Sequence, residues 1–282
     1  MKVQKQLYKD ERSLFGLKNI LVDECLFQST VGESPLKECI DVEVVGSTFD
    51  IRYPLWHSNN VKIDNCTFSI NTRAPFWYNK NINFYNTKIE SPKALREVNE
   101  GLMVKCIVKS SEFGWNVSNF NVLDSYIESE YAFFNSNAID INHIDFKGKY
   151  SFQYLNNSTI KDSVLNTKDA FWHSKNVTVI NCEINGEYLG WYSENLHLIN
   201  CKIKGTQPLC YCKNLVLTNC TMIDCDLAFE YSSVLATINS EVDSIKNPLD
   251  SNIKVSNVKE IIFDEFRKDT GNVIIEIEKR ED

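Results

Sequence analysis

The sequence is poor in glycine and proline, and it lacks any long apolar run. It has 10 glycines and 6 prolines in 282 residues, with 43% apolar and 24% charged residues. This profile is typical of a soluble globular protein and excludes a disordered chain, a collagen and a coiled coil. No stretch approaches the length of a membrane-spanning helix. Residues 1–16 contain no apolar segment of the signal-peptide kind, so we expect a cytoplasmic protein.

The sequence also lacks a positive net charge, CxxC pairs and clustered histidines, and this limits the partners and cofactors that we expect. The net charge of −8 makes neither nucleic acid nor an anionic membrane an expected partner. The 10 cysteines include no CxxC pair, and without an export signal we expect reduced thiols. The 4 histidines fall at scattered positions of the repeat described next, so we predict no metal site and no cofactor.

A repeat of about 19 residues covers nearly the whole chain, and a fixed short period of this kind is the signature of a repeat architecture. The segments NVTVINCEI from Asn176, NLHLINCKI from Asn195 and NLVLTNCTM from Asn214 begin at equal intervals. The same step leads back from Asn176 to Asn81, and the similar segment NVKIDNCTF begins at Asn60. We call the first residue of each copy position 0. About thirteen copies follow one another with no linker between them.

Apolar residues recur in each copy at positions −5, +1, +3 and +8. Apolar residues two apart in short stretches indicate β-strands. One such strand cannot bury its apolar face alone, whereas stacked copies bury a continuous core. The sequence therefore predicts an all-β right-handed parallel β-helix of about 13 coils, with three short strands in each coil. The right hand is expected because parallel crossovers are almost always right-handed, and the six-residue period of left-handed helices is missing.

We predict a single β-helix domain over residues 1–282. Residues 1–12 are expected to form an N-terminal cap strand, residues 13–262 the coils, and residues 263–282 a β-hairpin-like cap around the turn KDTGN. Caps are expected because an open stack exposes unpaired strand edges that promote aggregation.

Asparagine is abundant where glycine is scarce. Among 31 asparagines, nine occupy position 0 and seven occupy position +5. Asparagine tolerates the left-handed conformation that a sharp bend requires, and stacked asparagines can pass hydrogen bonds from coil to coil. In eleven copies position +6 holds Cys, Ser or Thr, which we expect to form an inward ladder just past the bend.

Several segments resemble a known family. These are GESPLKE (32–38), YPLWHSNN (53–60), TKDAFWHSKNVTV (167–179), GEYLGW (186–191) and DLAFEYS (226–232). They are similar to the bacterial domain-of-unknown-function family 3737, and the resemblance covers essentially the full chain. It implies a single-stranded right-handed β-helix, loosely akin to the pectate-lyase architecture, and no activity. Members have sometimes carried a hydrogenase label, which this sequence does not support because nickel–iron sites need paired CxxC thiolates.

Aromatic residues concentrate at two neighbouring positions. All tryptophans lie at position −4, namely Trp56, Trp77, Trp115, Trp172 and Trp191. Position −3 supplies His57, Tyr78, Tyr154, His173, Tyr192 and Tyr211. Strict strand alternation would turn position −3 inward with position −5, whereas a bend between them would turn it outward. These residues form either an exposed stripe that binds sugar rings or a partner protein, or a structural stack of packed aromatics.

Catalytic candidates are few. Asp169 and Glu187 fall at the same edge of adjacent coils, and Glu97 lies beside Arg96. Glycosidase carboxylates lie ~5–9.5 Å apart, which only residues on the same or adjacent coils satisfy. The GHG and RIK motifs of galacturonases and pectate lyases are missing.

Two functional hypotheses follow. The first is binding or processing of an oligosaccharide or polysaccharide along the aromatic stripe; an enzyme of this kind would be a hydrolase or lyase. The second is a non-catalytic scaffold that uses the stripe to bind another protein or to form a homo-oligomer. Likeness of fold alone does not decide between them.

Overall fold

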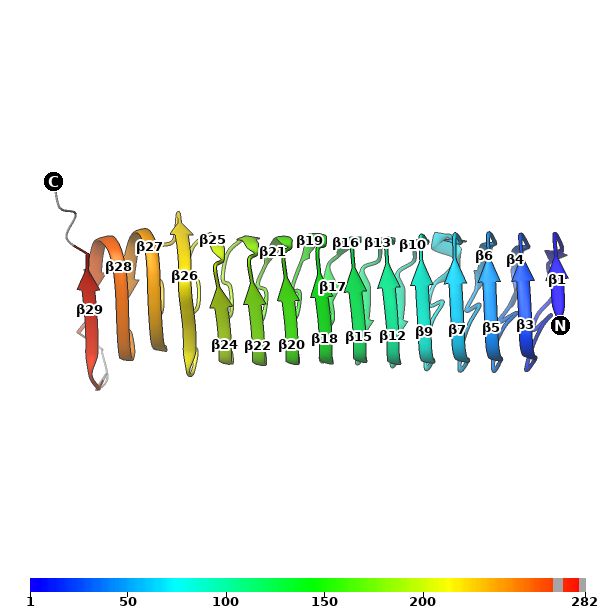
Figure 1. The fold of residues 1–282 in the computed structure, drawn as a ribbon, viewed down its shortest axis with the longest axis horizontal. Helices are drawn as coiled ribbons and strands as arrows, with labels where there is room; N and C mark the ends of the chain where they lie inside the picture. Colours follow the sequence, from blue (N-terminus) through cyan, green and yellow to red (C-terminus); the bar gives the residue numbers. More distant parts are fainter. Residues whose placement is uncertain (266–270, 279–282) are drawn as a thin grey trace. The chain divides into compact units, whose positions relative to one another are not determined.

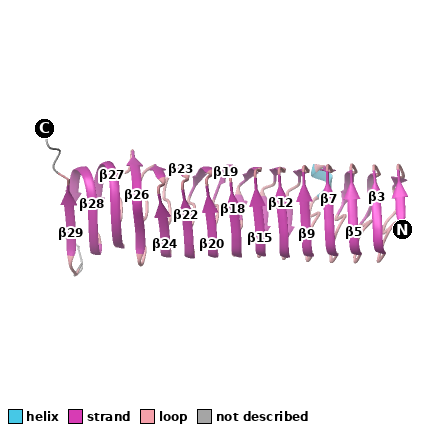
Figure 2. Ribbon diagram, in the orientation of Figure 1, coloured by secondary structure: helices cyan, strands magenta, loops and turns pink. Residues whose placement is uncertain are grey.

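The computed structural model describes residues 1–265 and 271–278. The chain divides into unit 1, Met1–Asp145, and unit 2, Phe146–Asp282. Within each unit, short strands stand side by side along the chain (Figure 1), and the described residues contain a single short helix, η1 (Ile70–Thr72) (Figure 2). The predicted fold class is confirmed. The protein is an all-β parallel β-solenoid of the right-handed type, with about 14 turns of about 19 residues.

Unit 1 has two regular faces and a shorter third one. Face A consists of β1 (Lys2–Gln4), β3 (Lys18–Asp23), β5 (Ile40–Val45), β7 (Asn59–Asp64), β9 (Lys80–Tyr85), β12 (Asn99–Val104), β15 (Ser118–Leu123) and β18 (Asn137–Asn142). Face B consists of β2 (Leu7–Tyr8), β4 (Leu26–Glu33), β6 (Thr48–Arg52), β8 (Thr67–Phe68), β10 (Lys88–Glu90), β13 (Ile107–Lys109) and β16 (Tyr126–Ser129). Face C consists of β11 (Lys93–Arg96), β14 (Glu112–Trp115) and β17 (Tyr131–Ala132).

Unit 2 continues the two-face pattern and then changes it. Its face A begins with β20 (Asn156–Lys161), β22 (Lys175–Ile180) and β24 (Glu194–Ile199), and its face B with β21 (Val164–Lys168), β23 (Glu183–Asn185) and β25 (Lys202–Lys204). β19 (Asp145–Lys149) spans the division between the units. The later strands are β26 (Leu215–Ile223), β27 (Ser233–Lys246), β28 (Leu249–Ile262) and β29 (Val273–Ile277). β26, β27 and β28 run through the bend at position +5 without interruption.

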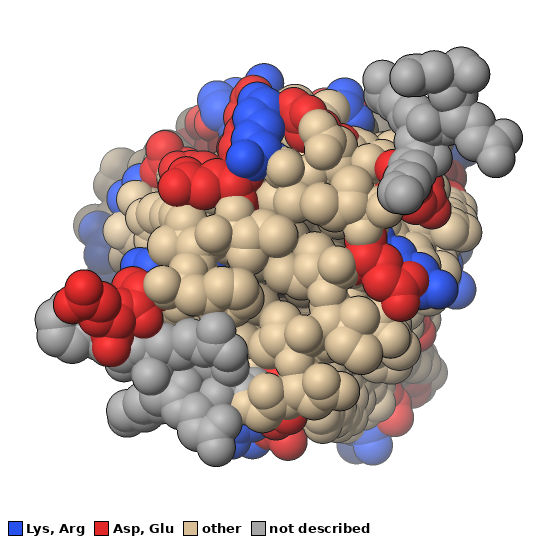
Figure 3. Space-filling view, turned by 90° about the vertical axis from the view of Figure 1, so that its left-hand side faces the viewer, with Lys and Arg blue, Asp and Glu red and all other residues tan. Residues whose placement is uncertain are grey.

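Both predicted caps consist of strands that pair in parallel with the coils. At the N-terminus, Val3 of β1 lies beside Val22 of β3. At the C-terminus, Val273 of β29 lies beside Ser251 of β28. This pairing differs from the hairpin expected for residues 263–282, and residues 268–270 of the expected turn lie outside the described residues. Figure 3 looks onto this end of unit 2, where uncharged residues occupy the middle and charged ones surround them. That the whole chain is one domain stays a prediction.

Identical columns of side chains fill the interior, because a repeat of constant length places like residues on one another. Position +8 stacks Phe27, Phe49 and Phe68, with ring centroids 4.6 Å apart in both pairs. All three rings are fully buried. Each such side chain contributes about 1.5–3 kcal/mol relative to an exposed one, so the column stabilises successive coils together.

The asparagine bends are confirmed. Asparagines at positions 0 and +5 are left-handed as far as Asn219, for example Asn176 (φ 54°) and Asn181 (φ 54°). The later Asn239, Asn252 and Asn257 lie within the continuous strands β27 and β28 and are not left-handed. Their side chains form ladders: the Asn195 amide donates to Asn176 Oδ1 at 2.8 Å, and the Asn200 amide donates to Asn181 Oδ1 at 3.1 Å. The small residues of position +6 are buried, as predicted, except Ser240, which is half-buried.

The third side of the coil differs from the prediction. A strand lies there only in the three coils of face C among the described residues. Elsewhere two left-handed residues form a tight turn, for example Phe171 (φ 60°) and His173 (φ 56°). Hydrogen bonds to adjacent coils hold this turn, since Phe171 N–H donates to Ser151 O and His173 N–H donates to Trp191 O, both at 2.9 Å. The turn breaks the strand alternation, so position −5 points inward and position −3 outward.

Candidate functional site

The outward position −3 builds a stack of rings in unit 2. We call Tyr154, His173, Tyr192, Tyr211 and Tyr231 the ring stack. Centroids of successive rings lie 4.9, 5.0, 4.9 and 6.0 Å apart, with interplanar angles of 12°, 8°, 12° and 27°. Tyr154 is 42% exposed and Tyr192 45% exposed. Because neighbouring rings cover each other's faces, the stack presents mainly ring edges to solvent.

Polar atoms of the ring stack are available to a ligand. The hydroxyls of Tyr192 and Tyr211 and the imidazole of His173 have no hydrogen-bond partner in the part of the chain that the structure describes. Burial, followed by the nearby Glu230 carboxylate, raises the pKa of Tyr211. This phenol therefore remains a hydrogen-bond donor at neutral pH.

A ladder of side-chain amides lies three residues beyond the rings in the sequence. The amide ladder comprises Asn157, Asn176, Asn195 and Asn214, each donating to the preceding one at 3.0, 2.8 and 3.1 Å. An asparagine amide has two N–H donors and an oxygen with two lone pairs. Asn176 and Asn195 each use one N–H donor and one lone pair in the ladder. Each therefore keeps one N–H donor and one lone pair for a ligand.

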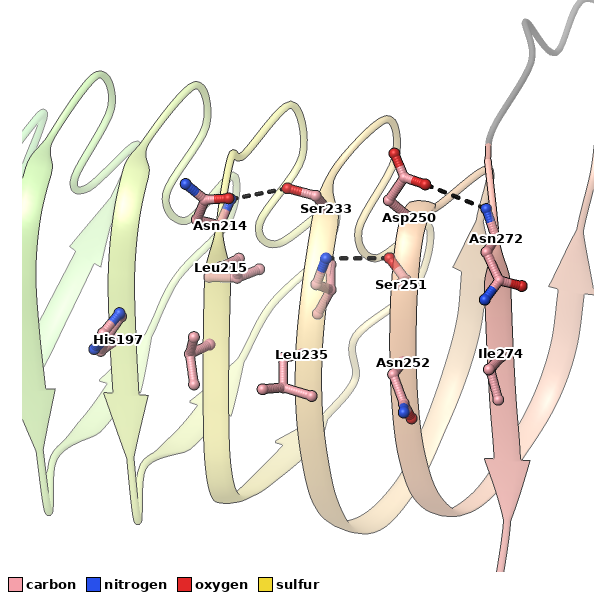
Figure 4. Close-up of a pocket in the computed structure, with 12 residues that line it drawn as sticks. His197, Asn214, Leu215, Ser233, Leu235, Asp250, Ser251, Asn252, Asn272 and Ile274 are labelled. Atoms are coloured by element: carbon pink, nitrogen blue, oxygen red, sulfur yellow. Dashed lines mark hydrogen bonds between the residues drawn. The ribbon is translucent and has the colours of Figure 1, made fainter.

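A shallow hollow lies at the C-terminal end of the amide ladder. It has a volume of about 560 Å³ and lies on the outer side of face A, where Asn214 forms part of its wall. Figure 4 shows its side chains on neighbouring strands, with Asn214 N–H donating to Ser233 Oγ at 2.8 Å. Leu235 is 58% exposed and Ile274 39% exposed, which gives the hollow an apolar floor beside the polar ladder.

The tryptophans are half-buried, and their polar atoms are committed to the fold. Trp172 and Trp191 stack with centroids 5.3 Å apart and an interplanar angle of 6°. Their indole N–H groups donate to backbone oxygens of the next coil, Trp172 to Tyr188 O at 2.6 Å and Trp191 to Gln207 O at 2.8 Å. Trp56, Trp77 and Trp115 donate in the same way to Ala74, Lys93 and Tyr131. This geometry favours the structural interpretation for position −4.

In unit 1, an arginine replaces one tryptophan of the column. The Arg96 guanidinium lies 4.9 Å from the Trp77 ring centroid and 4.6 Å from that of Trp115. It also forms an ion pair with Glu112, to which Lys93 adds a contact at 3.5 Å. Trp56 stacks on the far side of Trp77 at 5.2 Å. The structure thus joins these residues into one stack, in which the faces of Arg96 are covered by aromatic rings.

The remaining candidates of unit 1 occupy position −3. His57 and Tyr78 stack at 4.7 Å, and Tyr78 is 46% exposed. Glu97 accepts a hydrogen bond from the Asn116 amide at 2.7 Å. The column therefore changes from rings to polar side chains at this coil.

Asp169 and Glu187 lie on adjacent coils, as expected. Asp169 N–H donates to Glu187 O at 3.0 Å, and the Glu187 carboxylate pairs with Lys168 at 2.8 Å. The Asp169 side chain is buried, and this burial raises its pKa, while Lys168 and Lys149 oppose the rise. Their role in catalysis stays a prediction.

The thiols lie in the interior of the coils. All 10 cysteines are free and buried. The described residues contain no group of three or more His, Cys, Asp or Glu side chains placed to hold a metal ion. They also contain no helix that is long and apolar enough to cross a membrane.

Comparison with known proteins places the chain in a family. The model of a family described as "Protein of unknown function (DUF3737)" matches residues 1–276. The chain belongs to this family. No curated protein matches this DUF3737 chain.

Solved structures similar to the DUF3737 chain share its fold at low sequence identity. The surface adhesin PfbA of Streptococcus pneumoniae is 12% identical with a TM-score of 0.53, over 93% of this chain and 84% of the adhesin chain. The A-module of the mannuronan C-5 epimerase AlgE6 of Azotobacter vinelandii is 10% identical with a TM-score of 0.39, over 99% and 89% of the two chains. At these identities the likeness concerns the fold alone.

Two features of the DUF3737 chain were not predicted from its sequence. Tyr231 closes the ring stack, although it was not among the predicted site residues. The second feature is that position −3 turns outward. The sequence did contain an indication of this turn, because glycine replaces the bulky residue of position −5 at Gly114 and Gly190, both with φ 73°. A glycine that recurs at one position of a repeat indicates a left-handed residue there.

Proposed function

We propose that unit 2 binds an oligosaccharide or polysaccharide along the ring stack and the amide ladder. The observation that carries this proposal is the set of unsatisfied polar atoms on His173, Tyr192 and Tyr211, one in each of three successive coils. A polymer of hydroxylated rings offers donors and acceptors at a regular spacing. A repetitive polar surface of this kind is therefore suited to it.

The contacts we propose are hydrogen bonds to ring edges. Sugar rings often stack on exposed aromatic faces, but the faces inside this stack lie about 5 Å from the next ring, as between His173 and Tyr192 at 5.0 Å. Phenol hydroxyls, the imidazole and the spare amide groups would supply donors and acceptors instead. The exposed Leu235 in the adjoining hollow would add an apolar contact.

Tryptophan fluorescence tests this proposal. Trp191 contacts Tyr211 with centroids 5.6 Å apart, so it would report a ligand on the ring stack. We would titrate the protein with cellohexaose, xylohexaose and oligogalacturonate, and we expect a saturable change with at least one of them. The double variant Tyr192→Phe/Tyr211→Phe keeps the rings and removes both hydroxyls.

The expected loss in this double variant is about tenfold or more in affinity, since each hydroxyl hydrogen bond contributes about 0.5–1.5 kcal/mol. Tyr78→Phe makes the same change in unit 1 and should leave the affinity unchanged. The absence of a saturable response to every sugar would contradict the proposal.

The second candidate is self-association through the same rings. Tyrosine and tryptophan are enriched at protein interfaces, and the ring stack exposes several tyrosines. Light scattering during size-exclusion chromatography distinguishes the two. A dimer that Trp191→Ala dissociates would favour an interface. A monomer at high concentration would exclude self-association and so retain the saccharide proposal.

A further inference from the structure

The repeat lengthens at two places in unit 1. The copy that begins at Asn19 is followed by one at Asp41, and the copy at Asn60 by one at Asn81. Both steps are longer than the regular step, such as that from Asn176 to Asn195. The extra residues fall in β4 and around η1, which lie on the same side of the coil. Insertions of a repeat protein often build its binding face.

These extra residues border a hollow of about 640 Å³ on face B. β4 supplies Gln28–Val31, and the segment at η1 supplies Asn71 and Arg73. Asp50 and Arg52 of β6 lie between them, and Lys9 and Asp10 close the hollow from the preceding coil. Three cationic side chains therefore line one hollow of a chain whose net charge is −8.

Two of these cations have no ionic partner. Neither Lys9 nor Arg73 forms an ion pair within the described residues, although many exposed lysines of this protein do. Arg52 is partly used: Nη2 donates to Val31 O at 2.9 Å and lies 3.5 Å from the Glu33 carboxylate. Its Nε is buried with no hydrogen-bond partner. The hollow therefore holds positive charge and donors that the fold does not use.

A fixed carboxylate faces these cations. Asp50 Oδ1 accepts hydrogen bonds from Ser69 Oγ at 2.5 Å and from the Asn71 amide at 2.7 Å, and Gln28 approaches Oδ2 at 3.5 Å. The first two bonds lower the pKa of Asp50, so it is ionised at neutral pH. Its position is set mainly by Ser69 and by Asn71 of the lengthened copy. A held carboxylate of this kind accepts hydrogen bonds from ligand hydroxyls.

The backbone at Arg73 is strained. Its φ of 56° and ψ of −69° place it in the rare form of γ-turn, in which Thr72 O accepts a hydrogen bond from Ala74 N–H at 2.7 Å. Such conformations are energetically unfavourable and cluster at functional sites. Here the strained residue is also one of the two unpaired cations.

From these observations we infer that the hollow binds a small polyol that carries an oxyanion, such as a sugar acid or a sugar phosphate. Lys9 and Arg73 would hold the oxyanion, with Arg52 beside them. Asp50 and Asn71 would hydrogen-bond the hydroxyls. None of these residues belongs to the ring stack, so this site is independent of the proposed function.

Calorimetric titration tests the inference at low ionic strength, where exposed charges are least screened. The probes are glucuronate, glucose 6-phosphate, glucose and inorganic phosphate. We expect saturable binding of glucuronate, glucose 6-phosphate or both, and at least tenfold weaker binding of glucose. Which of the two binds more tightly identifies the oxyanion as a carboxylate or a phosphate.

Variants assign the binding to this hollow. Arg73→Gln and Lys9→Gln should each weaken it at least tenfold, whereas Arg73→Lys should retain part of it. Lys109→Gln removes an exposed lysine of β13 that does not line the hollow and should change nothing. Thermal unfolding of each variant checks that the fold is intact.

Three results would overturn the inference. They are no saturable binding of either charged sugar, equal binding to the wild type and the Arg73→Gln variant, and inorganic phosphate binding as tightly as glucose 6-phosphate. The last would mean that the hydroxyls make no contact. Loss of saccharide binding in Tyr192→Phe/Tyr211→Phe has no bearing on this hollow, so the two proposals fail separately.

Discussion

Small buried polar side chains complete the hydrogen bonding of the bends. Ser136 Oγ accepts a hydrogen bond from Val117 N–H of the preceding coil at 3.0 Å and donates to Gly114 O at 2.7 Å. Cys106 N–H similarly donates to Ser125 Oγ at 3.0 Å. A buried backbone group without a partner costs free energy comparable to a lost hydrogen bond. Residue size at these positions is therefore limited by the backbone and not only by packing.

Asn79 offers the sharpest test at this scale. Its Oδ1 accepts from Ser58 N–H at 2.7 Å and its Nδ2 donates to Leu55 O at 2.8 Å, with the side chain 2% exposed. Asn79→Ala leaves both backbone groups buried and unpaired, so we expect a loss of about 2–4 kcal/mol in the free energy of unfolding. Urea denaturation measures it. Asn59→Ala, at an exposed position of β7, should change it by less than about 0.5 kcal/mol; equal effects would contradict the argument.

At the scale of elements, the two strand faces could be predicted from the sequence and the third side could not. Faces A and B alternate apolar and polar residues with period two. On the third side, Phe171 and Leu209 are left-handed with φ of 60° and 62°. Bulky residues rarely adopt this conformation, so their identity predicts strand. Hydrogen bonds between coils and full burial of both side chains offset the strain, and neither can be recognised in the sequence of one repeat.

The candidate site divides in the same way. The sequence predicted which residues share a column, since a fixed register decides that. It did not predict that tryptophan N–H groups bond to the next coil or that position −3 faces outward, because both depend on the left-handed turn. The hollow in unit 1 was visible only as the two longer steps from Asn19 and Asn60.

The stack around Arg96 yields the prediction for this scale. Arg96→Ala removes two cation–π contacts and the ion pair with Glu112, whose side chain is 22% exposed and keeps only the Lys93 contact. We expect a loss of about 2–3 kcal/mol in the free energy of unfolding. Arg96→Trp combined with Glu112→Gln restores the residue found elsewhere in the column and should recover most of the loss. If urea denaturation shows the double variant no more stable than Arg96→Ala, the guanidinium has a different role.

At the scale of the whole molecule, the buried thiols couple stability to pH. Burial raises the pKa to about 11 for Cys66, Cys106 and Cys212, and to about 12 for Cys182, Cys210 and Cys225. The ordinary pKa of a thiol, which applies in the unfolded chain, is 9.0. Unfolding therefore releases protons above that pH. The stabilisation is fully present below pH 9 and is lost as the pH rises towards 12.

We therefore expect the free energy of unfolding to fall between pH 9 and pH 10.5, by about 1.4 kcal/mol per pH unit for each thiol. Urea denaturation at several pH values measures the slope. In the next coil, Ser125 occupies the position of Cys106, so a serine should be tolerated there. Cys106→Ser should reduce the slope by the contribution of one thiol. A pH-independent free energy over this range would show that the thiols titrate alike in both states.

The constant register within a unit has one more consequence. Each coil contacts only its neighbours, and every column continues unchanged from one copy to the next, as from Asn176 to Asn195. A gene that loses or duplicates one such segment still encodes matching columns, so the protein can evolve in whole coils. The ring stack would then shorten or lengthen by one ring at a time. The number of coils would then set the length of the polymer segment that the surface can bind.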